Sequence, residues 1–525
     1  MNLVILLFSI YIFMLEVKPS LNPNLLLFSF SKRVVKKDNL PLIIIIALAF
    51  FLRFWDIGWN GFNGDESIYS GQAASLLGEK DYIKHFAVFR AHPLLLQAMV
   101  SISFALFGVH DMVARIVPVI FGTLTVFVTY LVAKELFDRK IGLISCLILA
   151  LLPFHIVFSR QVLVDVPLSF FVMLFLYFVT KYRITGHNIY SYWTGVSCGL
   201  SFISKEVGII TIPIFLIYTL ITHSLKLNKF FIFFLGLISG VFPYFFLVLT
   251  RQDAANAIYH YAIFQLSREG HKFSPQYFSI LLNEAFGYVL SILCIVSVFL
   301  IWIESRRTKS RTYKEQIILL ILTLSTFFLF YQFLPSTGDR FMITLVPPAV
   351  ILGCAFLVTN SVRRLRVQKL LYLIIVPLII FSTNFYMSKV LPIEDLKISD
   401  GLGTTWKREA ALWIKNNAPV DAGILTDNMP LANIIRFYSI HSVYAVSISP
   451  NPSYLQVDNP AFLILNNNIT IIVQDLDPLR KSKATEELAK FLEFSDPKLV
   501  YTGFKHGIED GKDTATPMIK VYQLG

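Results

Sequence analysis

The chain has 525 residues, of which 55% are hydrophobic and only 15% are charged, and it contains 48 phenylalanines. Soluble domains carry about 25% charged residues, so this composition excludes an ordinary soluble enzyme and indicates a polytopic membrane protein. The net charge of +12 does not indicate a nucleic-acid-binding protein, because the basic residues gather in short loops between apolar segments.

The N-terminal region, residues 1–39, combines an apolar segment with a basic stretch. Met1–Leu15 is apolar, but no basic residue precedes its hydrophobic run, which makes it a poor signal peptide. An additional span, an interfacial helix and a misassigned start all remain open, and we assign this segment no role.

Apolar segments recur from Leu40 to about Met387, each long enough to cross about 30 Å of hydrocarbon. Clusters of Lys and Arg lie between them, and the positive-inside rule places these clusters on the cytoplasmic side. About 11 transmembrane helices satisfy this rule. The expected spans are Leu40–Trp55, Val113–Leu131, Ile141–Phe158, Val162–Thr180, Tyr190–Ser204, Val207–Thr222, Phe230–Leu249, Tyr277–Ile303, Gln316–Leu334, Phe341–Thr359 and Leu370–Met387.

One further apolar segment, His92–Gly108, is near the lower length limit for a span. Counting it as a span would move the cluster at Lys134, and the later clusters, to the outer side. We therefore expect a juxtamembrane helix that lies in or re-enters the outer interface within the first outer loop.

The chain becomes more polar from about Leu391, as a soluble domain should. Helices are expected at 410–416 and 431–438, and strands at 423–426, 470–473 and 518–522. This alternation indicates a small α/β domain. With an odd number of spans this domain lies outside, where it would recognise an acceptor or simply pack onto the membrane module.

Ionisable residues collect in the outer loops and at the outer ends of the expected spans. An ionisable group at membrane depth costs about 2.5 to 3.5 kcal/mol on insertion scales, so this concentration indicates a reaction centre. The set comprises Asp65, Glu66, His92, Arg115, Arg160, Asp165, Lys205, Glu206, Arg251, Asp253, Arg268, Asp339 and Arg340.

Four motifs carry a family resemblance: GDESIYSGQAASLL from Gly64, AHPLLL from Ala91, the stretch Phe107–Gly142 around Arg115, and FSRQVLVDVPLSFF from Phe158. Together they resemble the N-terminal module of GT-C-fold glycosyltransferases, in particular the protein O-mannosyltransferase and aminoarabinose transferase group. The resemblance covers about residues 40–387. The stretch EAALWIKNNAPVDAGILTDNMPLANIIRFYS also resembles the extracytoplasmic domains of prokaryotic members.

The resemblance implies an all-α polytopic membrane protein of GT-C type with a C-terminal α/β extracytoplasmic domain. The expected units are residues 1–39, a catalytic membrane module at 40–390 and the outer domain at 391–525. The implied reaction moves a mannose-like sugar from a polyprenyl (dolichyl or undecaprenyl) phosphate to a hydroxyl on protein, lipid or glycan. The expected location is the cell membrane, with the active site on the outer face. A transporter or flippase of lipid-linked sugars is the alternative.

The resemblance assigns the general base to Asp65, because an acceptor hydroxyl with a pKa far above 7 must lose its proton. Glu66 would position the acceptor or ligate a metal. Alternatively, it would stabilise a helix N-terminus with Asp65 as the N-cap. Asp165 would join Asp65 around the acceptor, or form an ion pair with Arg160. No cofactor is certain; a divalent cation stays open, with Asp65 and Asp165 as its ligands.

The leaving phosphate requires cations, and Arg115, Lys205 and Arg340 are the candidates. Each is also consistent with an interfacial anchor that snorkels. His92 is a further site candidate, expected to be hydrogen-bonded rather than bound to a metal. The loop at 251–276 is expected to be a lid over the lipid-sugar or an interfacial helix.

Overall fold

The structure, a computed structural model, describes residues 39–89, 92–224, 226–250, 252–267, 276–308, 311–333, 338–359, 362, 368–382, 405–446, 460–476, 483–509 and 512–524. The N-terminal segment and the expected domain boundary near residue 390 lie outside these ranges, as do Arg251, the side chain of Asp253 and Arg268.

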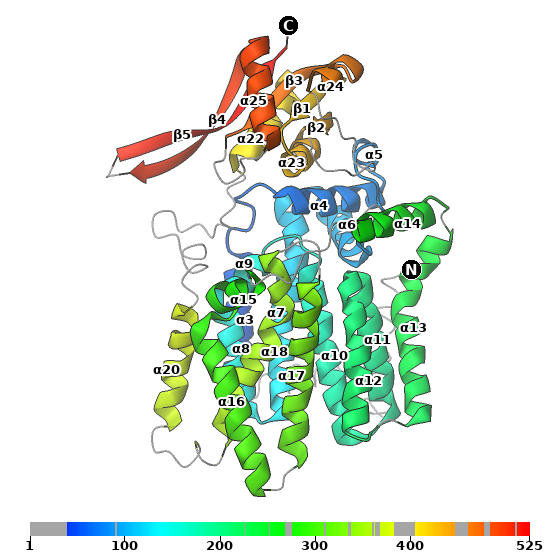
Figure 1. The fold of residues 1–525 in the computed structure, drawn as a ribbon, viewed down its shortest axis with the longest axis vertical. Helices are drawn as coiled ribbons and strands as arrows, with labels where there is room; N and C mark the ends of the chain where they lie inside the picture. Colours follow the sequence, from blue (N-terminus) through cyan, green and yellow to red (C-terminus); the bar gives the residue numbers. More distant parts are fainter. Residues whose placement is uncertain are drawn as a thin grey trace.

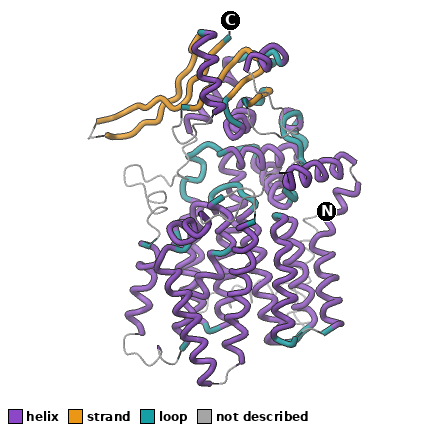
Figure 2. Tube along the Cα trace, viewed as in Figure 1, coloured by secondary structure: helices purple, strands orange, loops and turns teal. Residues whose placement is uncertain are grey.

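A bundle of helices makes up the lower part of the molecule, and a small domain with all the described strands lies at one end (Figures 1 and 2). Among the described residues, five helices are long and apolar enough to cross a membrane, and a bent pair gives a sixth candidate. The five are α7 (Asp111–Leu136), α10 (Asp165–Thr185), α13 (Leu227–Thr250), α16 (Gly287–Thr308) and α17 (Arg311–Gln332).

Shorter helices complete the bundle, and each of the expected spans overlaps a helix. These elements are α3 (Leu40–Phe54), α8 (Arg139–Leu151), α9 (Pro153–Ser159), α11 (Asn188–Ser204), η2 (Glu206–Ile210), α12 (Thr211–Ile221), α15 (Gln276–Ile280), η3 (Leu281–Ala285), η4 (Asp339–Thr344), α18 (Val346–Cys354), η5 (Ala355–Val358) and α20 (Gln368–Phe381). The prediction of a polytopic helical protein is therefore confirmed.

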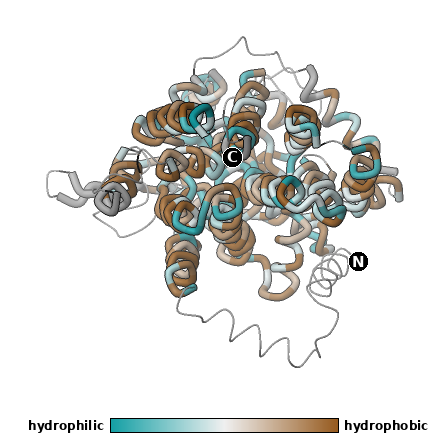
Figure 3. Tube along the Cα trace, turned by 90° about the horizontal axis from the view of Figure 1, so that it is seen from below, coloured by the Kyte–Doolittle hydropathy of each residue, from teal (hydrophilic) through white to brown (hydrophobic). Residues whose placement is uncertain are grey.

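Large apolar side chains point outward from the bundle, as a bilayer requires. Phe231 and Ile238 on α13 are 64% and 55% exposed, and Ile295 on α16 is 71% exposed. In the view from below, hydrophobic residues make up long stretches of the helices of the bundle (Figure 3).

The bent pair α8 and α9 meets at an angle of 63°. Pro153 opens α9 and has no N–H to continue the hydrogen-bond ladder of α8. The carbonyls of Leu149 and Ala150 instead accept hydrogen bonds from the buried guanidinium of Arg53, at 3.1 and 3.2 Å. Arg53 on α3 therefore stabilises the bend by binding the carbonyls that it leaves open.

Three helices lie across the end of the bundle near the small domain: α4 (Gly64–Leu77), α6 (Leu95–Phe107) and α14 (Gln252–Ser267) (Figure 1). A short helix, α5 (Lys80–Ile83), follows α4. Helix α6 corresponds to the expected juxtamembrane segment and packs against α4 and α7. Helix α14 forms part of the expected lid segment, and its Ala254 packs with Phe89 and Leu94 beside α6.

The C-terminal domain is a five-stranded mixed sheet in the order β2-β1-β3-β5-β4. Strand β1 is parallel to β2 and β3, whereas β5 is antiparallel to β3 and β4. The strands are β1 (Gly423–Thr426), β2 (Ser442–Ala445), β3 (Ile469–Asp475), β4 (Lys498–Glu509) and β5 (Lys512–Gln523), and the helices are α22 (Thr405–Asn417), α23 (Met429–Ser439), α24 (Pro460–Asn466) and α25 (Lys483–Ser495). The predicted small α/β domain is confirmed.

The C-terminal domain packs on the bundle through α23, which lies against α4. The Tyr438 hydroxyl donates to Asp111 Oδ2 at 2.6 Å and accepts from the backbone N–H of Phe62 at 2.7 Å. The rings of Phe62 and Phe437 meet edge to face, 5.0 Å apart. These contacts place the domain directly over the loop that leads into α4.

Candidate active site

Helix α4 carries the Asp-Glu pair in its first turn, and Asn63 is its N-cap. Asn63 Oδ1 accepts from the backbone N–H groups of Asp65 and Glu66, both at 3.0 Å. Glu66 Oε2 in turn accepts a hydrogen bond from the backbone N–H of Asn63, which completes a capping box. The alternative in which Asp65 caps the helix is therefore wrong, and the Asp65 side chain turns elsewhere.

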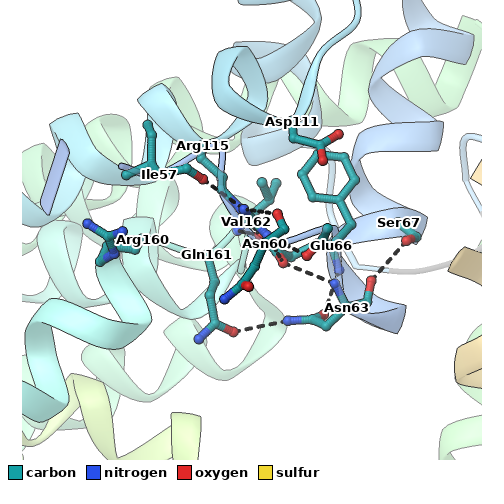
Figure 4. Close-up of polar contacts among 12 residues, drawn as sticks. Ile57, Asn60, Asn63, Glu66, Ser67, Asp111, Arg115, Arg160, Gln161 and Val162 are labelled. Atoms are coloured by element: carbon teal, nitrogen blue, oxygen red, sulfur yellow. Dashed lines mark hydrogen bonds and ion pairs between the residues drawn. The ribbon is translucent and has the colours of Figure 1, made fainter. Parts of the chain in front are cut away.

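Arg115 and Glu66 form a buried bidentate ion pair between α7 and α4 (Figure 4). Arg115 Nε and Nη2 donate to the two carboxylate oxygens of Glu66, each at 2.8 Å. The other N–H groups donate to the carbonyls of Ile57, Asn60 and Gly61 at 2.7 to 2.9 Å. All five N–H groups of the guanidinium are thus engaged within the protein.

The same network ties α4 to the segment that precedes α10 (Figure 4). Glu66 Oε1 accepts from the backbone N–H of Val162 at 3.0 Å, and Asn63 Nδ2 donates to Gln161 Oε1 at 3.0 Å. Because α10 begins at Asp165, these bonds fix the position of Asp165 relative to Asp65.

Four of the sequence candidates form a chain of alternating charge. Arg340 donates to Asp65 Oδ2, and its Nε lies 3.7 Å from Asp165 Oδ2. Lys205 Nζ donates to Asp165 Oδ1 at 2.6 Å. The side chains of Asp165 and Lys205 are 1% and 5% exposed, whereas those of Asp65 and Arg340 are 39% and 26% exposed. The chain therefore runs from a buried end at Lys205 to an accessible carboxylate at Asp65.

Arg340 is incompletely hydrogen-bonded where it faces Asp165. Within the described part of the chain, Arg340 Nε and Asp165 Oδ2 are both buried and have no hydrogen-bond partner. The two atoms face each other 3.7 Å apart, so they attract each other as charges without the added stabilisation of a hydrogen bond.

The surrounding charges control Asp65 electrostatically. Burial raises the pKa of the Asp65 carboxyl. The charge and hydrogen bond of Arg340, with a smaller contribution from His92, lower this pKa by a larger amount, so it lies below its usual value. Asp65 is consequently ionised at neutral pH and able to accept a proton.

Arg160 does not pair with Asp165, so that alternative is also wrong. Its guanidinium donates instead to backbone carbonyls at the end of α3, including those of Arg53 at 3.2 Å and Leu52 at 3.3 Å. The C-terminal carbonyls of a helix lack intrahelical partners, and an arginine is a favourable cap for them.

His92 is hydrogen-bonded, as its sequence context predicts: its Nδ1 lies 2.8 Å from Glu206 Oε2. Burial raises the pKa of Glu206. The neighbouring His92 lowers this pKa by a larger amount, so it lies below the usual value. The ring of Tyr69 on α4 lies 6.1 Å from the His92 ring. This pair borders the charged chain, because Glu206 directly follows Lys205.

The described residues contain no group of three or more His, Cys, Asp or Glu side chains arranged to hold a metal ion. Asp65 and Asp165 both face Arg340, so a divalent cation between them would have to displace the guanidinium. The arrangement does not fit a metal site, and we derive no chemistry from one.

Several residues of the site escaped the sequence reasoning. Asn63, Gln161, Asp111 and Tyr438 all hold the first loop or α4 in place. Only the spacing of Asn63 and Glu66, which is that of a capping box, gave a signal in the sequence.

Comparison with known proteins places the fold. Residues 91–249 match the family model described as dolichyl-phosphate-mannose-protein mannosyltransferase. An uncharacterized protein from Aquifex aeolicus (strain VF5) is 27% identical over 183 residues. That match spans only 34% of this chain and 34% of the relative.

Solved structures match over most of the chain. ArnT from Cupriavidus metallidurans in the apo state has a TM-score of 0.65 at 14% identity, over 91% of this chain and 97% of that one. The same protein bound to undecaprenyl phosphate has a TM-score of 0.64 at 15% identity, with the same coverage. The Archaeoglobus fulgidus oligosaccharyltransferase tethered with an acceptor peptide has 0.55 at 14% identity, over 91% and 73%. The chain therefore has the GT-C fold, as its motifs predicted.

Proposed function

We propose that this protein is a membrane glycosyltransferase that moves a sugar from a polyprenyl phosphate to an acceptor hydroxyl. The observation that carries this proposal is the chain Asp65, Arg340, Asp165 and Lys205, which sets a partly exposed carboxylate beside two cations at one end of a GT-C bundle. The family match and the ArnT-like fold support the same reaction class. The undecaprenyl phosphate bound to ArnT supports a polyprenyl-phosphate donor.

The reaction is a single displacement. The acceptor oxygen attacks the anomeric carbon, the bond from that carbon to the phosphate oxygen breaks, and its electron pair leaves with the polyprenyl phosphate. Asp65 takes the hydroxyl proton in the transition state, a contribution typically of about 10² to 10⁴-fold. The configuration at the anomeric carbon inverts.

Arg340 and Lys205 stabilise the charge on the leaving phosphate. The Arg340 side chain is 26% exposed, so its guanidinium can reach a lipid headgroup. Lys205 is buried behind it against Asp165 and the ring of Phe341, 3.9 Å away, and strengthens the local positive potential. Asp165 positions both cations rather than binding the acceptor.

Arg115 and Glu66 have a different role from the one their positions in the sequence suggested. Every N–H of Arg115 is already used, and both Glu66 oxygens accept two bonds each. We therefore assign them to holding α4, and with it Asp65, in place. His92 positions Glu206 at the edge of the site.

We propose that the active site faces the outer side of the cell membrane. The basic clusters fall in turns such as those between α7 and α8 and between α12 and α13, at the end opposite the C-terminal domain (Figure 1). The positive-inside rule then puts Asp65 and that domain outside. The residues before and after about 390 would thus form a catalytic membrane module and an outer domain that borders the acceptor, which is a protein, lipid or glycan.

The test is transfer of radiolabelled sugar from a panel of polyprenyl-phosphate sugars, including a mannose donor, in membranes with endogenous acceptors. Wild-type transfer should fall by at least about 100-fold in Asp65→Asn, as expected for loss of a general base. Asp81→Asn, which changes an exposed carboxylate on α5, is the matched control and should keep its activity.

Equal activity in wild type and Asp65→Asn would remove Asp65 from catalysis. No transfer from any donor by a folded protein, combined with movement of a lipid-linked sugar across the bilayer, would favour a transporter or flippase instead.

A further inference from the structure

Arg340 is shared between two carboxylates. It contacts Asp65 and approaches Asp165, and it comes from η4, an element distant in sequence from both. Asp65, unlike Asp165, has no other ionic partner among the described side chains. The proposed base is therefore held by the cation that the proposed donor would also contact.

Arg115 has a structural role in this protein, and its contacts differ from those of Arg340. It is 4% exposed and uses every N–H in hydrogen bonds of good length. Arg340 is 26% exposed, and its buried Nε has no hydrogen-bond partner among the described residues. Its contacts can therefore be exchanged for those of an incoming anion at lower cost.

A phosphate is a strong competitor for such a guanidinium. Arginine binds phosphate through two parallel hydrogen bonds, a match of geometry as well as charge. Lys205 lies behind Arg340 and adds attraction for the same anion, but its own bond to the buried Asp165 remains.

We propose that the donor phosphate and Asp65 compete for Arg340, so that donor binding releases Asp65 and turns the ligand-free ion pair into an active base. This inference rests on the proposed function, because it takes a polyprenyl phosphate as the competing anion. It goes further in that the empty site is held inactive by a contact that the donor removes. The donor should then bind before the acceptor is activated.

The release has a thermodynamic signature. If Asp65 and phosphate exclude each other at Arg340, each weakens the binding of the other by the same factor. Removing the charge of Asp65 should therefore tighten phosphate binding, although it abolishes transfer. Substitution of a residue that only contacts the donor would weaken phosphate binding. Substitution of a residue that only supports the fold would not tighten it.

The experiment measures the Kd of undecaprenyl phosphate for the purified full-length protein, by quenching of its intrinsic fluorescence. Asp65→Asn should bind undecaprenyl phosphate about tenfold more tightly than the wild type. The wild type must break the charge-assisted hydrogen bond between Arg340 and Asp65 when the phosphate binds, and the variant does not bear this cost. In an Arg340→Gln background, the same substitution should change the Kd by less than about twofold. Size-exclusion profiles of all variants establish that each is folded.

Glu206→Gln is the matched control for removal of a nearby negative charge. Glu206 lies beside Lys205 but pairs with His92 rather than Arg340, so any tightening should be small and should not depend on Arg340. Unchanged or weaker binding by Asp65→Asn, or equal tightening in both backgrounds, would overturn the competition while leaving the proposed function intact. Failure of the wild type to bind undecaprenyl phosphate would overturn both.

Discussion

Pro430 of the C-terminal domain lies directly against Gly64, the residue that precedes Asp65. A Cβ atom on Gly64 would lie only 2.9 Å from the Cα of Pro430. The first turn of the helix that carries the proposed base is thus in contact with the first turn of α23. This contact gives the outer domain a direct mechanical link to Asp65, so an acceptor bound near α23 would also border the base.

The closeness of these residues predicts a specific effect of Gly64→Ala. The added methyl group would meet backbone atoms of Pro430, which cannot move aside as a side chain can, and α23 would have to shift away from α4. Overpacking of this kind typically costs about 1 to 3 kcal/mol. We expect transfer to fall by more than about tenfold while the membrane bundle stays folded, measured as activity per amount of monodisperse protein.

Gly58→Ala controls for the loss of a glycine in the same loop. A Cβ there would lie 3.5 Å from the Cβ of Met112, an ordinary contact distance. Activity should be retained; an equal loss in both variants would show that loop flexibility, and not the contact with Pro430, matters.

The two arginines of the site should respond differently to substitution. Arg115→Ala would leave Glu66 charged and buried without its partner, which costs about 3 to 5 kcal/mol. Arg340→Gln removes a partly exposed cation that is incompletely bonded. We expect Arg115→Ala to lower the yield of monodisperse protein sharply, and Arg340→Gln to keep that yield but lose transfer. Fluorescence-detected size exclusion, followed by the transfer assay, separates these outcomes; a folded but inactive Arg115→Ala would return Arg115 to the donor-binding residues.

Hydropathy predicted where the helices lie because burial in a bilayer depends mainly on local composition. The expected span Val113–Leu131 lies inside α7, and the strand Gly423–Thr426 is found with the predicted ends. The same signal placed Asp65 and Arg340 at one end of the bundle, since Asp65 lies in the loop after the first span and Arg340 directly precedes the span Phe341–Thr359.

Hydropathy could not predict which charged side chains form ion pairs with one another. Arg160 and Asp165 are close in sequence, yet Arg160 turns to the carbonyls of α3, and Asp165 pairs with Lys205 from another loop. Which charges meet depends on how the helix ends are arranged in space, and local sequence does not carry that information. Arg115 resembled a phosphate ligand by its place in the sequence, but its role depends on the three carbonyls of the folded first loop.

The C-terminal domain should lose stability as the pH rises. Burial raises the pKa of Asp427 from 3.8 to about 6, with a further contribution from Asp475. A carboxyl whose pKa is higher in the folded state binds its proton more tightly there, so the contribution to stability is present at low pH. It is lost as the pH rises from about 4 through about 6, by up to about 3 kcal/mol.

The measurement is the Tm of the full-length protein, followed by tryptophan fluorescence between pH 5 and 7.5, with Trp406 and Trp413 inside this domain. Asp427→Asn should remove most of the pH dependence. The buried Asp475 is paired with Lys407 at 2.7 Å, so Asp475→Asn, which breaks that pair, should instead lower the Tm at every pH. A wild-type Tm that rises with pH over this interval would contradict the assignment.

The charge of Arg340 should also appear in the pH profile of transfer. A general base works only when deprotonated, so activity falls as the pH drops through the pKa of Asp65. The acid limb of kcat/KM for the donor reports the enzyme before the donor binds, when Asp65 still contacts Arg340. Because burial raises the pKa of Asp65 while Arg340 and His92 lower it below its usual value, this limb should lie at low pH in the wild type. Arg340→Gln removes the largest lowering charge, so its residual activity should show an acid limb shifted to higher pH, whereas Arg340→Lys should shift it less. His92→Gln removes a smaller positive contribution and should move the limb in the same direction by less than Arg340→Gln. An acid limb that stays in place in all three variants would mean that the ionisation of another group, and not that of Asp65, limits transfer.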